Sequence, residues 1–310
     1  MTPERTQYPI VEKINILLFI AVMPAIWGLL WLGSHAALPW ALLAAVTFSL
    51  VNHLPFSLMH EAVHGVFSEN RTRNEFFGAL AGAVFPTSFF LQRFAHLGHH
   101  RRNRTDEELY DYYLPTQSRR LKNFNLYAGN LFGLYWFCIP FGTLVYLISP
   151  WLYSSKWFIE GPARVLGFEP YVREIAKLPK FRIWIECLLA VSYQVLVWRV
   201  LELNWQGWLL CYGAFALHWS ALQYVDHAWS PRDVINGAWN LKVLPVTSAF
   251  ALNYHYHLAH HRHPQVPWLY LPKLVEADDP RPTFWSIYFR LWGGTRPAPP
   301  MVGGTDPLSS

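Results

Sequence analysis

The 310-residue chain is 53% hydrophobic and only 15% charged, whereas about a quarter of the residues of a soluble domain are charged. This composition excludes a soluble two-domain enzyme, and the 17% of aromatic residues fits a membrane interface or an apolar tunnel. The net charge of +5 is not arranged as a basic stripe, so we expect contact with a membrane surface and no nucleic acid partner.

Four apolar runs are long enough to cross a membrane, since about 20 helical residues span the hydrocarbon core. A short polar break separates the first two runs and a tight turn separates the last two, so they pair as two hairpins. The sequence therefore predicts an all-α integral membrane protein with four transmembrane helices. Their approximate bounds are residues 14–33, 37–58, 183–203 and 208–224, and the second helix is expected to continue to His64.

Two further apolar runs are less regular. Residues 76–91 are short for a span and contain Pro86, and residues 124–148 are divided by Pro140. Such segments are tolerated at membrane depth only where they pack on protein. We therefore predict that both are interfacial or re-entrant helices.

Lysine and arginine are distributed unevenly about the predicted spans. Of the 25 basic residues only Arg199 lies near the two short outer loops. The positive-inside rule then makes the side that holds both termini and the site cytoplasmic, in a bacterial inner membrane or an ER-type membrane. We expect one domain over residues 1–296, with a histidine-rich cytoplasmic cap from about Asp226, and a disordered tail over residues 297–310.

Eight of the 14 histidines fall into three sequence motifs with the spacings HxxxH, HxxHH and HxxHH. Residues three or four apart share one face of a helix, so each motif directs at least two imidazoles the same way. Imidazole is the commonest metal ligand in proteins, and eight are enough for two metal ions. The predicted ligands are His60, His64, His96, His99, His100, His257, His260 and His261.

This motif combination resembles the membrane fatty acid desaturase superfamily, which is similar in turn to alkane hydroxylases and carotenoid ketolases. The segment around the third motif, residues 253–261, continues through Pro264, Pro267 and Trp268. It resembles the HHxxPxxPWxxLP segment of that superfamily. The resemblance covers roughly residues 35 to 275.

The resemblance implies a centre of two iron ions that uses O2 as co-substrate to oxidise an unactivated C–H bond of a lipid. A fatty acyl desaturase is the leading interpretation. A hydroxylase, a ketolase and a terminal-alkene-forming decarboxylase remain open alternatives. The eight clustered histidines would be iron ligands and His227 a ninth. Gln223 stands where acyl-CoA desaturases carry asparagine, which implies a water-mediated role.

Other polar residues near the motifs have weaker assignments. Glu61, Asp226 and His255 are candidates to support the ligands, since a ligating imidazole usually donates its second N–H to a nearby acceptor. His53 and His218 lie deep in predicted spans, where they would line a substrate channel or serve packing. No catalytic residue beyond the metal ligands is expected.

His60–His64 also matches HExxH, the signature of zinc proteases, with Glu61 as general base. An intramembrane metalloprotease is therefore an alternative from a different class. That reading leaves both HxxHH motifs unexplained, because a catalytic zinc takes only three protein ligands.

The sequence contains no haem-binding, iron–sulfur or dinucleotide motif. We therefore expect a separate electron donor of the ferredoxin, rubredoxin or cytochrome type, docking on the basic cytoplasmic face. Arg101, Arg102 and Arg104 form a cluster that would meet this donor or an anionic lipid head group.

Overall fold

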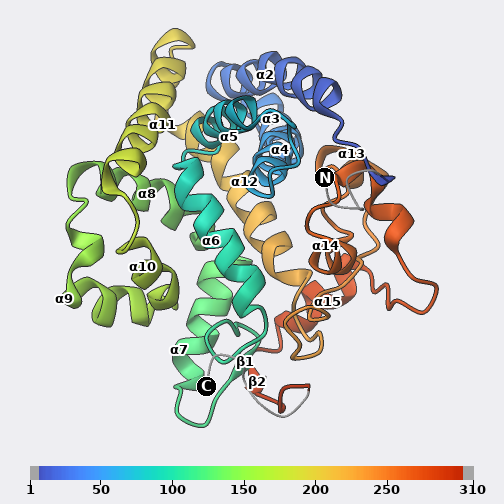
Figure 1. Cartoon of the computed structure of the whole chain (residues 1–310). Coiled ribbons are helices and arrows are strands. Elements are labelled where there is room, and N and C mark those ends of the chain that lie inside the picture. Colours follow the sequence, from blue (N-terminus) through green and yellow to red (C-terminus); the bar gives the residue numbers. More distant parts are fainter. Residues whose placement is uncertain (1–6, 303–310) are drawn as a thin grey trace.

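The computed structural model describes residues 7–302, which fold into a mostly helical structure (Figure 1). Helix α12 runs through the middle of the molecule and packs against α2, α3 and α8. The long helices are α2 (Glu12–His35), α3 (Leu38–Val51) continued by α4 (His53–Val63), α11 (Lys180–Val200) and α12 (Trp205–Val225). The shorter helices are α5 (Arg71–Val84), α6 (Phe89–Arg102), α7 (Arg119–Phe124), α8 (Leu134–Ile148), α9 (Lys156–Phe158), α10 (Glu169–Ile175), α13 (Pro245–Phe250), α14 (His257–Arg262) and α15 (Phe284–Leu291). Short segments of other helix types are η1 (Asn125–Leu131), η2 (Leu152–Ser154), η3 (Ile159–Ala163) and η4 (Trp268–Leu274).

Within residues 7–302, three helical stretches are long and apolar enough to cross a membrane: Glu12–His35, Leu38–Val63 and Lys180–Val200. They coincide with the first three predicted spans. The fourth predicted span lies in α12, which has 21 residues but falls outside this apolar set. Helix α12 also carries polar side chains such as His218 and Gln223. The arrangement of four spans with a cytoplasmic cap stays a prediction.

The irregular run at residues 124–148 contains a sharp bend. The segments on its two sides, Arg119–Leu131 and Leu134–Ile148, make an angle of 83°. The prediction that Pro140 divides this run is wrong, because α8 continues through it and the break falls at Gly133. Gly133 has a φ of +83°, and a Cβ there would lie 2.9 Å from the α12 backbone at Ala216. Only glycine combines this backbone conformation with so close an approach.

Helix α6, which carries the second histidine motif, is fixed at its N-terminus. Residues 76–91 are split between α5 and α6, and Ser88 caps α6 by accepting the backbone N–H of Leu91. The Ser88 hydroxyl also donates to Glu186 of α11 (2.8 Å), which accepts the N–H of Phe90 as well (2.6 Å). This anchorage directs α6 past α4, with which it packs.

The segment that was expected to be a disordered tail begins with defined contacts. Strand β2 (Arg296–Pro297) pairs in parallel with β1 (Tyr112–Tyr113), and Arg232 donates to the carbonyl of Pro299 (2.8 Å). Residues 297–302 thus lie against the helical body, which differs from the expectation. Residues 303–310 lie outside the described part of the chain.

Candidate metal centre

The histidine motifs lie on separate helices that meet at one place. They come from the end of α4, from α6, from α14 and from the turn after α12. They form two groups, in each of which the candidate ligand atoms all lie within 4.8 Å of one another. The first cluster is His60, His64, His96 and His260, and the second cluster is His99, His227, His257 and His261.

Two helices supply ligands to both clusters. On α6, His96 belongs to the first cluster and His99 to the second, and the adjacent residues His260 and His261 of α14 divide in the same way. The ninth imidazole, His100, has its Nε2 atom 3.0 Å from those of both His96 and His260, and its ring stacks on His261. All nine histidines that we predicted as ligands are therefore brought together.

The imidazole nitrogens of the clusters mostly face one another. Nε2 of His60 lies 2.9 Å from that of His96, and Nε2 of His227 lies 2.9 Å from that of His257. Both ring nitrogens of His64 are buried without a hydrogen-bond partner among the described residues. Buried polar atoms are normally paired, so these nitrogens fit a cation held between them. An all-imidazole donor set suits iron, zinc or copper.

The protonation state of the imidazoles agrees with this role. Burial lowers the pKa of His96, His257, His260 and His261 well below its ordinary value, and the neighbouring imidazoles lower it further. These four side chains are therefore neutral at physiological pH. Neutral imidazole is the form that binds a metal ion.

Two candidate ligands of the second cluster are oriented by hydrogen bonds to residues outside it. The Nδ1–H of His227 donates to the carbonyl of Gly237 (2.8 Å), and Nδ1 of His99 is hydrogen-bonded to the carboxylate of Glu108. A hydrogen bond at Nδ1 fixes the tautomer and leaves Nε2 free for a metal ion. Sequence reasoning missed Glu108, because it lies in an irregular loop after α6 where no periodicity singles it out from Glu107.

Of the residues predicted to support the ligands, Asp226 lies beside the second cluster, whereas Glu61 and Gln223 bind other groups. Asp226 faces two candidate ligands: its Oδ2 lies 3.6 Å from Nδ1 of His257, and its Oδ1 lies 3.9 Å from Nε2 of His227. Glu61 instead accepts the backbone N–H of Trp268 (3.1 Å). Gln223 accepts the hydroxyl of Tyr254 (2.9 Å) through its carbonyl oxygen, while its Nε2 is buried without a partner among residues 7–302.

Three predicted site residues lie apart from both clusters. The ring of His53 packs on that of His218, with ring centroids 4.4 Å apart, and neither residue lines the cavity that reaches the clusters. The ring of His255 packs on Tyr256. None of the three belongs to the two groups of candidate ligands.

A cavity of about 480 Å³ adjoins the clusters and is walled by α6, α8, α10 and α12. It reaches His96, His99 and His227 at one part of its wall. Elsewhere it is lined largely by apolar and aromatic side chains, and the exposed residues Phe141 and Trp157 lie at its edge. We name this space the metal-adjacent cavity. Its volume and lining suit an apolar chain that extends to the candidate ligands.

Comparison with known families agrees with the geometry. The family model "Fatty acid desaturase" matches residues 36–288, a range that includes every histidine of both clusters. The chain belongs to the fatty acid desaturase family. No curated protein matches the chain. As a member of this family, the protein is an oxidoreductase that acts on fatty acyl substrates in a membrane context.

The arginines that follow the second motif are not the exposed cluster that we expected. Arg102 is buried and its guanidinium lies 2.6 Å from the carboxylate of Glu174, and Arg104 is buried against Asp111. Only Arg101 is exposed, and it also contacts Glu174. The prediction is wrong for Arg102 and Arg104, because each pairs with a carboxylate in the interior, Arg102 with the distant Glu174 and Arg104 with the nearby Asp111.

Replacing Glu108 by alanine is expected to weaken metal binding at the second cluster about 10–100-fold, because His99 loses the acceptor that orients it. The measurement is metal content after dialysis against a graded series of chelator concentrations. Glu107→Ala, a change of the same size at the more exposed neighbouring residue, is the matched control. Equal metal retention in both variants would show that Glu108 does not support the site.

Proposed function

We propose that the two histidine clusters bind two iron ions, and that the protein uses O2 to oxidise an unactivated C–H bond of a lipid. Introduction of a double bond into a fatty acyl chain is the form that we favour. The observation that carries the proposal is a pair of adjacent four-histidine clusters at the wall of an apolar cavity. When bound, the iron ions supply the activation of oxygen and the removal of hydrogen.

The protein itself holds the ions and places the substrate. The imidazoles occupy fixed positions on α4, α6 and α14, so little reorganisation accompanies metal binding. Large side chains such as Tyr135, Trp219 and Tyr254 line the metal-adjacent cavity. They restrict the position of an alkyl chain and exclude water from the reacting carbon.

The zinc protease alternative has less support. Its general base would be Glu61, which already accepts a backbone N–H from Trp268. The two clusters also contain eight histidines, whereas a catalytic zinc needs three protein ligands and an open position. The second cluster would then have no role.

Electrons for this reaction would come from a separate donor of the ferredoxin, rubredoxin or cytochrome type, and we place the site on the cytoplasmic side of the membrane. The predominance of basic residues on one side of the predicted spans supports that orientation. Arg101 is the exposed residue of the arginine group and thus the one available to a donor.

Product analysis tests the proposal directly. The purified protein, loaded with iron, is supplied with free fatty acids or acyl-CoA, O2 and a reducing system, and the products are identified by mass spectrometry. We expect a new double bond, and none under anaerobic conditions. A hydroxyl group, a ketone or a terminal alkene one carbon shorter would instead identify one of the alternative reactions. Absence of any O2-dependent lipid product with both irons present would contradict the proposal.

A further inference from the structure

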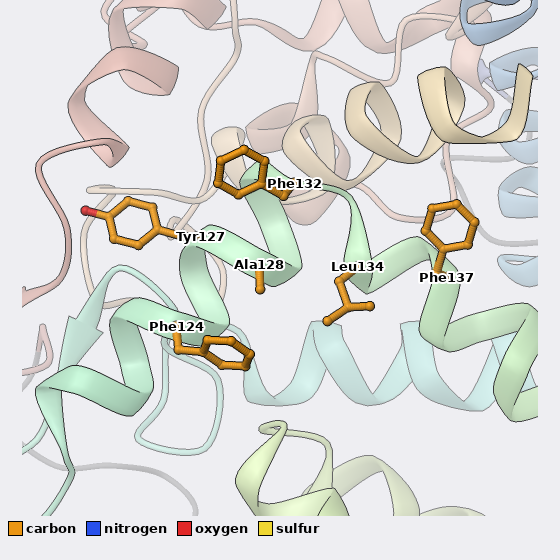
Figure 2. A pocket seen from close by; sticks show the side chains of 6 residues that line it. All are labelled: Phe124, Tyr127, Ala128, Phe132, Leu134 and Phe137. Atoms are coloured by element: carbon orange, nitrogen blue, oxygen red, sulfur yellow. The ribbon is translucent and has the colours of Figure 1, made fainter. Parts of the chain in front are cut away.

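A second apolar hollow lies at the bend between η1 and α8. It has a volume of about 430 Å³, and we name it the elbow groove. Figure 2 shows its side chains, with Phe124, Ala128 and Leu134 next to one another at the bend. Phe124 and Phe132 are 55% and 60% exposed. Tyr127 carries the one polar side-chain atom among the lining residues, and its hydroxyl donates to the carbonyl of Trp292 (2.9 Å).

The walls of the elbow groove therefore offer an occupant no unpaired polar side-chain atom. Such a surface favours an apolar ligand, since a polar group pressed against these side chains would exchange hydrogen bonds to water for none. The bent segment to which the groove belongs is also apolar enough to enter a membrane. A segment that enters a membrane meets the alkyl chains of lipids, and these are apolar ligands of the required kind.

A narrow space shares lining residues with both the elbow groove and the metal-adjacent cavity. Phe124, Ala128 and Leu134 line both this space and the groove, whereas Tyr135 and Cys138 line both this space and the cavity. The narrow space, which we name the throat, encloses only about 30 Å³, against about 430 Å³ and 480 Å³ on its two sides. The three spaces thus form a row with a constriction in the middle.

The wall of the throat contains a glycine that leaves space open. A Cβ at Gly129 would meet no atom within 4 Å, so its small size is not required by packing. Glycine inside a helix is destabilising relative to alanine. A role in keeping the throat passable accounts for a residue that the packing does not demand. Leu134 and Phe124, on the same wall, are exposed enough to rotate aside.

We propose that the throat is a gate, and that the alkyl chain of the lipid substrate passes through it between the elbow groove and the metal-adjacent cavity. The identity of this chain as the substrate rests on the proposed function. The passage itself rests on the shared walls of the three spaces and on their apolar character.

The test places a plug in the throat and measures access to Cys138. This cysteine lines both the throat and the metal-adjacent cavity, whereas Cys187 and Cys211 are fully buried and serve as internal controls. The probe is a long-chain alkyl methanethiosulfonate added to the full-length protein in detergent micelles. The plug is Gly129→Phe. The matched control is Gly28→Phe in α2, where a Cβ also meets nothing within 4 Å and which lines none of the three spaces.

We expect Gly129→Phe to slow labelling of Cys138 about tenfold or more, since about 1.4 kcal/mol of added barrier is sufficient for a tenfold effect. Turnover of a long-chain substrate should fall in parallel, while iron content matches that of the wild type. In the Gly28→Phe variant, labelling of Cys138 and turnover of the long-chain substrate should proceed at wild-type rates. Gly129→Leu, a smaller plug, gives the same comparison if the phenylalanine variant fails to fold.

Wild-type labelling rates in both plug variants would overturn the gate, because alkyl chains would then reach Cys138 from the edge near Phe141 and Trp157. Labelling requires neither iron nor O2, so it separates this inference from the proposed function. Slowed labelling together with no lipid product from the wild type would support the gate and reject the oxidation chemistry.

Discussion

A His257→Ala variant is expected to hold one iron ion per chain where the wild type holds two, and to lose turnover by more than about 100-fold. His257 belongs to the second cluster alone, so the first cluster should keep its ion. Loss of a residue that merely supports a ligand already costs about 10–100-fold, and loss of the ligand itself should cost more. Iron content by elemental analysis and turnover by product formation are the two measurements. His64→Ala is expected to give the same result through the first cluster.

The matched control is His35→Ala, which removes an exposed imidazole at the far end of α2 whose Nε2 contacts the carbonyl of Leu201. It should keep both ions and full turnover. Stoichiometric zinc with no iron in the wild-type protein would contradict the proposed function. Two ions retained in both His64→Ala and His257→Ala would show that the clusters are not the binding sites.

Replacing Asp111 by alanine is expected to lower the free energy of unfolding by about 3–5 kcal/mol, because it leaves the buried guanidinium of Arg104 without its counter-ion. Arg104 and Asp111 are 1% and 0% exposed and are joined by two hydrogen bonds of 2.8 and 3.0 Å. Asp111 also accepts the hydroxyl of Tyr224 and the backbone N–H of Trp229 (2.7 Å). The measurement is denaturant or thermal unfolding of the purified protein in detergent.

The control for that comparison is an ion pair on the surface. Arg164 is mostly exposed and pairs with Glu169, so Arg164→Ala should lower the free energy of unfolding far less than Asp111→Ala does. The double variant Arg104→Met with Asp111→Leu removes both charges and should recover part of the stability lost in Asp111→Ala. A cost for Asp111→Ala no larger than that for Arg164→Ala would show that the buried pair does not hold this loop.

The sequence contained enough information to locate most of the long helices and to single out the histidines that the fold brings together. A span must be long and apolar because the bilayer core offers no hydrogen bonds, and ligands on a helix must recur at its period. These local requirements leave a readable pattern. The division into two clusters was not readable, because whether His96 and His99 serve the same ion depends on where α4 and α14 cross α6.

Other errors have the same origin in contacts between distant segments. Pro140 is the stronger helix breaker by residue type, yet the chain bends at Gly133, because the backbone of α12 lies too close there for a side chain. Arg102 belongs to a residue type that is usually exposed, but Glu174, far along the chain, pairs with it in the interior. No local pattern records these partners.

Helix α6 contributes histidines to both clusters. The spacing of the clusters and the lining of the cavity beside them therefore depend on different parts of the molecule. His96 and His99 are three residues apart on one helix, a rise of about 4.5 Å along its axis, so regular backbone geometry sets the offset between the two sites. Several of the side chains that line the metal-adjacent cavity come from α8 and α10, which contribute no histidine to either cluster. Substitutions in those two helices can therefore change which molecules are accepted while the spacing of the two histidine clusters stays constant. The fold permits diversification of specificity without loss of the underlying redox chemistry.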